Sequence, residues 1–192
     1  MSIYDFILQR RTIRSFKQNP VSYELLEKIV NAGRLAPSGS NLQPLEFIIV
    51  DEPEKVAQVY AHTKWAGYLP PDQGPPPEGK RPTAFVVIII NRSRREKGGA
   101  HDVGAAIMNM ILTGLEESIG SCWIASIDRN KLRTLLSVPE RCDIDSVVAF
   151  GYLDESPISE DRDDTVKYYR DEQNVLHVPK RPIECVLHHN KY

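Results

Sequence analysis

The chain has 192 residues, the length of one domain with room for an extension, so we expect a single domain over residues 1–192. Hydrophobic residues make up 41% and charged residues 26%, a globular composition that argues against global disorder. The net charge of −2 argues against a nucleic-acid partner, which needs a strongly basic face. The longest apolar run, over 84–90, is far shorter than the ~20 residues of a membrane helix.

Two features bear on the compartment. Cys122, Cys142 and Cys185 are widely spaced and form neither a zinc-ligand pattern nor an even disulfide framework. The first residues, over 1–5, lack the basic and apolar regions of a secretory signal. We therefore expect a reducing, cytoplasmic location.

The chain begins with a helix signal. Ser2-Ile-Tyr-Asp5 has the form of a capping box, with Asp in place of the usual Glu. We expect a short helix that ends near Arg10 and buries three apolar side chains: Ile3, Phe6 and Ile7.

Hydrophobic periodicity predicts the remaining elements. The first half has a helix over 22–35, a strand over 45–50, a helix over 53–62 and a strand over 85–90. A long apolar helix over 102–119 follows, and then strands over 121–125, 146–150 and 183–187. The rest of the tail after Asp154 is expected to be irregular. Strands and helices are mixed without regular βαβ alternation, so the pattern favours an α+β fold.

A proline-rich stretch over 64–82 interrupts the pattern and is unsuited to a helix interior or a central strand. A long ordered loop is often a lid, although it can also be an inert surface excursion. Trp65 and Tyr68 offer aromatic faces for a planar acceptor, and Lys64 offers a charge for an anionic group. The alternative is that Trp65 merely anchors the loop to the core.

Several familiar sequence motifs are incomplete or absent. Gly99 and Gly104 have the spacing of P-loop glycines, but alanines follow where Lys and Ser or Thr are required. There is no Gly-x-Gly-x-x-Gly fingerprint and no Gly-x-Ser-x-Gly nucleophile elbow. His188 and His189 are adjacent without a spaced partner, so we expect no metal site.

The cluster Arg10-Arg-Thr-Ile-Arg14 stands where the first helix should end. Guanidinium groups make charge-assisted, often bidentate bonds to phosphate. An alternating backbone would aim Arg10, Thr12 and Arg14 to one side. The alternative is a solvated basic helix end that complements the helix dipole.

Two further segments have small and polar residues suited to a planar ligand. Ala36-Pro-Ser-Gly-Ser-Asn-Leu-Gln-Pro44 offers donors and acceptors at Asn41 and Gln43, although Asx-turn chemistry alone explains such a loop. Gly120-Ser-Cys-Trp-Ile-Ala-Ser126 predicts a strand whose small end could bring backbone N–H groups against a ring.

Together and in this order, these segments resemble the flavin-dependent nitroreductase family. The stretch over 10–16 is similar to its Arg-Arg-Ser-x-Arg-x-Phe opening, and the stretch over 36–44 to its Ala-Pro-Ser-x-x-Asn-x-Gln-Pro loop. His101-Asp-Val-Gly-Ala-Ala106 resembles the start of its long dimer-forming helix, and Ile119-Gly-Ser-Cys-Trp-Ile124 the strand beneath its flavin. Pro179-Lys-Arg-Pro182 resembles its C-terminal phosphate-binding end.

The resemblance implies a three-layer fold, with a mainly antiparallel sheet between helices, in an interlocked homodimer with FMN at the interface. It also implies that residues 178–192 wrap the partner subunit. The implied FMN contacts are Arg10, Arg11, Thr12 and Arg14 at the phosphate and pyrimidine edge, Pro37, Ser38, Gly39 and Asn41 from the other subunit, Gln43 near the ring, Ala125 and Ser126 near N5, and Lys180 and Arg181 at the phosphate. Some family members have Glu-Gly in place of Ala125-Ser126.

The implied activity is a ping-pong transfer of reducing equivalents from NADH or NADPH to a small electrophilic acceptor, such as a nitroaromatic or a quinone. The cofactor carries the chemistry, and Arg14 is the candidate for stabilising negative charge on the reduced ring. Two alternatives remain open at this point: a flavin-fragmenting oxygenase of the same superfamily, and a flavin-binding module without enzymatic activity.

Overall fold

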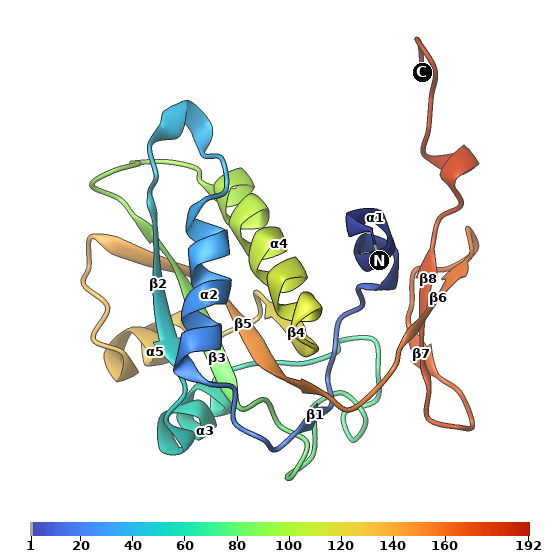
Figure 1. The fold of residues 1–192 in the computed structure, drawn as a ribbon, viewed down its shortest axis with the longest axis horizontal. Coiled ribbons are helices and arrows are strands. Elements are labelled where there is room, and N and C mark those ends of the chain that lie inside the picture. The colour runs from blue at the N-terminus through green and yellow to red at the C-terminus, as the bar shows by residue number, and fades with distance from the viewer. Residues whose placement is uncertain (1) are drawn as a thin grey trace.

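The computed structural model of the chain describes residues 2–192. Its main sheet lies between helices, and a second small sheet lies to one side (Figure 1). The strands of the main sheet are β1 (Phe16–Lys17), β2 (Leu45–Val50), β3 (Ala84–Asn91), β4 (Ile119–Ile124) and β5 (Cys142–Leu153). The helices are α1 (Ile3–Gln9), α2 (Tyr23–Arg34), α3 (Pro53–Ala61), α4 (Ala100–Glu116) and α5 (Arg129–Leu135).

Every pairing in the main sheet is antiparallel. Strand β3 pairs with β2 on one edge and with β5 on the other, while β4 pairs with the free edge of β5. The short β1 pairs with β5 beyond the end of β3. All eight residues of β3 are buried because helices cover both faces of the sheet, which explains its uninterrupted apolar run.

Alternate residues of β3 point into two separate cores. Phe85, Val87 and Ile89 pack with apolar residues of α3 and α5. Val86 and Ile88, on the opposite face, pack with α2 and α4. The result is a layer of helices, an antiparallel sheet and a second layer of helices, so the expected α+β fold class is confirmed.

The sheet register fixes where the connecting segments lie. Leu45 is opposite Ile90, so the loop before β2 lies at the end of the sheet where β5 begins. Phe16 is opposite Leu153, so the segment before β1 lies at the end where β5 finishes. Strand β5 has 12 residues and therefore spans roughly 35 Å. That length separates the two segments within one chain.

The capping chemistry is as the sequence predicts. Ser2 Oγ accepts from the Asp5 N–H at 3.2 Å, and the Asp5 carboxylate accepts from the Ser2 N–H at 2.7 Å. Ser22 caps α2 with a single bond, because its Oγ accepts from the N–H of Leu25. The predicted strand over 45–50 is confirmed as β2.

The apolar face of α1 is not buried as expected. Within residues 2–192 of one chain, α1 contains no buried residue, and Ile3 is 77% exposed. The helix projects from the side of α4 and the main sheet (Figure 1). A helix buries its apolar face only against another element, and within one chain α1 makes few contacts with α4.

Two boundaries of the central segments differ from expectation. The long helix α4 ends at Glu116, and Ile119 already belongs to β4. Ser118 makes the turn between them with a left-handed backbone, φ 61°. No helix formed by residues 2–192 is long and apolar enough to cross a membrane.

The tail after Asp154 is more regular than predicted. Strands β6 (Ile158–Asp161), β7 (Tyr169–Arg170) and β8 (Leu176–Lys180) form the second sheet, in which β8 is parallel to β6 and antiparallel to β7. The strand predicted over 183–187 is wrong: a 3₁₀ helix, η2 (Ile183–Cys185), stands there. Its turn follows Pro182, and the Ile183 carbonyl accepts from two later N–H groups.

Candidate functional site

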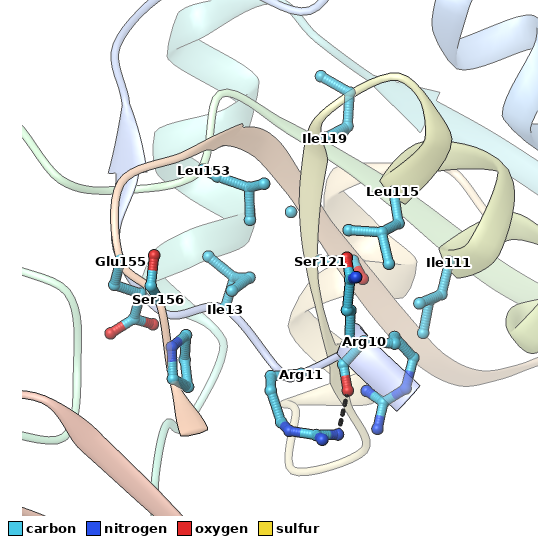
Figure 2. A pocket seen from close by; sticks show the side chains of 13 residues that line it. Arg10, Arg11, Ile13, Ile111, Leu115, Ile119, Ser121, Leu153, Glu155 and Ser156 are labelled. Carbon is cyan, nitrogen blue, oxygen red and sulfur yellow. Dashed lines mark hydrogen bonds between the residues drawn. The ribbon is translucent and has the colours of Figure 1, made fainter. Parts of the chain in front are cut away.

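A cleft of about 230 Å³ opens beside the segment that follows α1 (Figure 2). Arg10 ends the helix because its ψ of 123° leaves the helical region. Arg10 and Arg11 line the same end of the cleft, with Ile13 and Leu115 beyond them. This part of the site therefore combines two guanidinium groups with an apolar wall.

Within residues 2–192, neither arginine is paired with a carboxylate. Arg11 Nη2 donates to the Leu8 carbonyl at 2.6 Å and to Ser159 Oγ at 2.7 Å, neither of which is a charged partner. Burial and the charge of Arg11 lower the pKa of Arg10, and burial lowers the pKa of Arg11. Both shifts reflect poorly solvated cations, which an entering anion would stabilise.

Arg14 lines a neighbouring cleft of about 510 Å³, together with Lys80 and the prolines over 75–77. The consecutive Arg10 and Arg11 line the first cleft, whereas Arg14 lines the second. The expectation that Arg10, Thr12 and Arg14 share one side is therefore wrong for Arg10 and Arg14. Glu155 lines both clefts. Thr12 is half-buried between the arginines.

The guanidinium of Arg14 is held from one side only. Its Cζ lies 4.8 Å from the ring centroid of Tyr168. Its buried Nε has no hydrogen-bond partner within residues 2–192. Because an unpartnered buried donor is costly, this atom indicates an acceptor supplied from outside the chain.

A buried ion pair fixes the backbone beneath Arg14. Glu155 accepts from the Arg14 N–H and from Arg170 Nη2, the latter at 2.9 Å. The Glu155 and Arg170 side chains are only 10% and 13% exposed. The sequence reasoning missed Glu155, Arg170 and Tyr168. The run Tyr168-Tyr-Arg170, which stands out in an otherwise polar tail, is the signal that could have found two of them.

The loop over 36–44 presents its polar groups outward on a strained backbone. Ser40, Asn41 and Gln43 have φ of 53°, 54° and 47°, which in non-glycine residues costs of order 1–3 kcal/mol each. Ser38 stabilises this shape, because its Oγ accepts from the Gln43 N–H at 3.0 Å and its carbonyl from the Asn41 N–H at 2.9 Å. Pro37, Gly39 and Asn41 are exposed.

Two predicted site segments meet at the end of β4. Ala125 and Ser126 line a broad hollow of about 880 Å³ together with Lys64. The Lys64 N–H donates to the Ser126 carbonyl at 2.9 Å. Arg129 Nη2 donates to the Ala125 carbonyl at 3.3 Å. The start of the proline-rich loop is therefore attached to the strand end that was expected to line the cofactor ring.

The aromatic residues of the proline-rich loop have different surroundings. Trp65 packs against one of the cores, 5.8 Å from the Tyr60 ring, and its Nε1 donates to Thr63 Oγ1 at 2.8 Å. This packing favours the anchor over the stacking role for Trp65. Tyr68 is 54% exposed, and its ring lies 5.1 Å from that of Tyr168. Tyr68 thus remains available to a ligand near Arg14.

We expect Trp65→Ala to lower the free energy of unfolding by about 2 kcal/mol, because it removes a half-buried core contact. Acceptor KM should stay within about twofold. The exposed Tyr68→Ala is the matched variant and should leave stability nearly unchanged. Urea denaturation and steady-state kinetics of both variants measure these effects. A tenfold KM rise in Trp65→Ala with intact stability would restore the stacking role.

The C-terminal basic pair lies beside the partner of Arg11. Ser159, which Arg11 contacts, is opposite Val178 in the register of β6 and β8, two residues before Lys180. Arg181 Nε lies 3.3 Å from a carboxylate oxygen of Asp163, and both side chains are exposed. The basic pair thus follows the strand beside the Arg11 contact, but Lys180 and Arg181 do not line the cleft within one chain. Within residues 2–192, no group of three or more His, Cys, Asp or Glu is arranged to hold a metal.

Comparison with known proteins gives a consistent result. Residues 7–152 match the model of the nitroreductase family. A candidate NADH dehydrogenase/NAD(P)H nitroreductase of Archaeoglobus fulgidus is 31% identical over 153 residues, which cover 76% of this chain and 82% of that protein. An FMN-dependent nitroreductase of Clostridium difficile superposes with a TM-score of 0.69 at 27% identity, over 97% of this chain and 98% of that one.

A second solved structure is a candidate nitroreductase of Desulfovibrio desulfuricans in complex with FMN. It superposes with a TM-score of 0.67 at 27% identity, over 85% of this chain and 93% of that chain. The family match over 7–152 includes the arginine cluster, the loop over 36–44 and the end of β4.

Proposed function

This chain belongs to the nitroreductase family and is an oxidoreductase; on that premise we propose that it uses FMN to pass reducing equivalents from NADH or NADPH to a small electrophilic acceptor, such as a nitroaromatic or a quinone. The observation that carries the proposal is the cleft with Arg10 and Arg11, two poorly solvated guanidinium groups beside an apolar wall. A terminal phosphate suits such a site better than the extended diphosphate of FAD.

The residues present fit this cofactor. Arg10, Arg11 and Thr12 offer donors to a phosphate, and Lys180 and Arg181 complete that end. The unpartnered Nε of Arg14 fits a carbonyl oxygen at the pyrimidine edge of the ring. The exposed Ala125 and Ser126 leave their backbone open to a flat ring, while Lys64 is held beside them.

We also propose a homodimer in which each site uses both subunits. The arginine cluster and the loop over 37–43 lie at opposite ends of the sheet, too far apart for one small cofactor. In a dimer, that loop of one subunit would face the cofactor held by the arginines of the other. Gln43 would then lie near the ring.

Exposed apolar surface supports this assembly. Within one chain, α1 exposes Ile3, Tyr4, Ile7 and Leu8, and the extension over 178–192 exposes Ile183, Val186 and Leu187. Such surfaces are usually covered by a partner. We infer that the extension wraps the other subunit and that the chain acts as a single domain. All three cysteines are free thiols, which agrees with the proposed cytoplasmic location.

Bound at this site, FMN would supply the hydride chemistry, with NADH or NADPH as the donor and, in the proposed ping-pong order, the acceptor as the second substrate. Arg14 then stabilises negative charge at the edge of the ring. The loop over 64–82, with the exposed Tyr68, covers the side of the ring where the acceptor binds, and it limits the size of the acceptor. Ala125 and Ser126 are exposed, so solvent reaches this face and delivers the proton.

The proposal is tested by purifying the protein and recording its visible spectrum. We expect a yellow protein that releases FMN on denaturation, sediments as a dimer and oxidises NADH or NADPH in the presence of a quinone. Colourless protein that takes up no added FMN would overturn the proposal. A yellow monomer would overturn only the dimeric site. Intact FMN after turnover separates a reductase from an enzyme that fragments its flavin.

A further inference from the structure

One buried carboxylate is aimed at the loop over 37–43. Asp102 lies in the first turn of α4, and its side chain is 5% exposed. Its Oδ1 accepts from the Gly39 N–H at 3.0 Å, and its Oδ2 accepts from Arg95 Nη1 at 3.1 Å. Both oxygens therefore connect α4 to elements outside the helix.

The helix itself does not use this carboxylate. Asp102 is the third residue of α4, where an acidic side chain in a capping box would bond back to the N–H of the capping residue. Here the capping residue is Gly99, and the helix start has no side-chain capping bond. A buried charge is retained at this position although its bonds serve the loop before β2, not the helix end.

Arg95 completes the arrangement from the connection between β3 and α4. Its Nε donates to the Lys97 carbonyl at 3.1 Å, which sets the direction of the guanidinium. Nη1 passes so close to Gly39 that a Cβ added there would lie 2.8 Å from it. Gly39, Arg95 and Asp102 are therefore in close contact, and a side chain at position 39 would displace the end of the Arg95 guanidinium.

We propose that Asp102 and Arg95 are positioning residues that hold the loop over 37–43 in the shape that receives the cofactor of the other subunit. The inference rests on the proposed function. Neither side chain contacts the cofactor. They act through Gly39, whose N–H they fix at the start of the strained turn over 40–43. When the loop is held in one shape, none of the binding free energy of FMN is spent on selecting that shape from alternatives.

The test measures the FMN dissociation constant by fluorescence titration for Asp102→Asn, Arg95→Ala and Gly39→Ala. If a substitution frees the loop so that it has its cofactor-binding shape only about a tenth of the time, the affinity for FMN falls about tenfold. The rate at which bound FMN is reduced should not change in Asp102→Asn and Arg95→Ala, because these two side chains act on the loop and not on the cofactor. Asp143→Asn is the matched control, since Asp143 pairs at 2.6 Å with Arg92 of the same connection but not with the loop.

A double-mutant cycle keeps the test decisive if Asp102→Asn does not fold. Gly39→Ala acts by displacing Arg95, so it should add nothing in the Arg95→Ala background. Additive losses of affinity would assign Gly39 a direct contact and overturn the inference. So would unchanged FMN affinity in folded Arg95→Ala. Failure of the wild-type protein to bind FMN would instead overturn the proposed function, and the inference with it.

Discussion

Replacing Arg10 and Arg11 together by alanine should weaken FMN binding by at least about 100-fold. A hydrogen bond to a charged group contributes about 1.5–3 kcal/mol, so two lost phosphate contacts remove at least about 3 kcal/mol of binding free energy. The two guanidinium groups line one end of the cleft, and their lowered pKa values indicate cations that lack full solvation. Titration of the apoprotein with FMN measures the loss.

The control variant removes the same two positive charges from another part of the surface. Lys131 and Arg141 are exposed and lie outside the clefts, so the double variant Lys131→Ala/Arg141→Ala should keep its FMN affinity. The difference between the two double variants isolates the cleft from the long-range field of the protein. Equal, small losses in both would contradict a phosphate site at Arg10 and Arg11.

The main sheet could be predicted because its signal is hydrophobic and local. Strand β3 is apolar over 84–90, and β2 follows a loop marked by Pro and Gly. The end of α4 could not be predicted in the same way. Ser118 adopts the left-handed turn that glycine usually marks, so neither Gly nor Pro stands at the turn between the helix and β4 to signal the boundary.

The second sheet has no such signal. Its strands have two to five residues, and polar side chains stabilise it. His177 lies between Glu160 and Asp171, with Nε2 3.0 Å from the Asp171 carboxylate, and its ring stacks on Tyr169. Short polar strands lack the alternation that sequence analysis depends on, so this region was expected to be irregular.

The candidate site could be predicted in pieces, but not in its connections. The arginine cluster and the two small-residue segments are visible because each is short and unusual in composition. The pair of Glu155 and Arg170 is not, because each is an ordinary charged residue until the fold buries them together. The same holds for Asp102, which reads as an acid in a first helical turn.

Replacing Arg14 by alanine should slow the reduction of bound FMN by about 100-fold, the effect of removing one donor from developing negative charge. FMN affinity should fall by less than about tenfold, since the phosphate contacts at Arg10 and Arg11 remain. The backbone should keep its place, because Glu155 binds the Arg14 N–H and not its side chain. Stopped-flow measurement of flavin absorbance under NADH or NADPH, at saturating FMN, gives the rate.

Arg14→Lys separates charge from shape. A lysine keeps the positive charge but lacks the planar fork that stacks on Tyr168 and carries the buried Nε. We expect its reduction rate to fall between those of the wild type and Arg14→Ala, because an ammonium stabilises the ring by charge alone. If Arg14→Ala instead loses FMN while any bound cofactor is reduced at the normal rate, Arg14 is a binding residue only. Lys64 would then be the next candidate for charge stabilisation, because it lines the same hollow as Ser126 and its backbone N–H bonds to the Ser126 carbonyl.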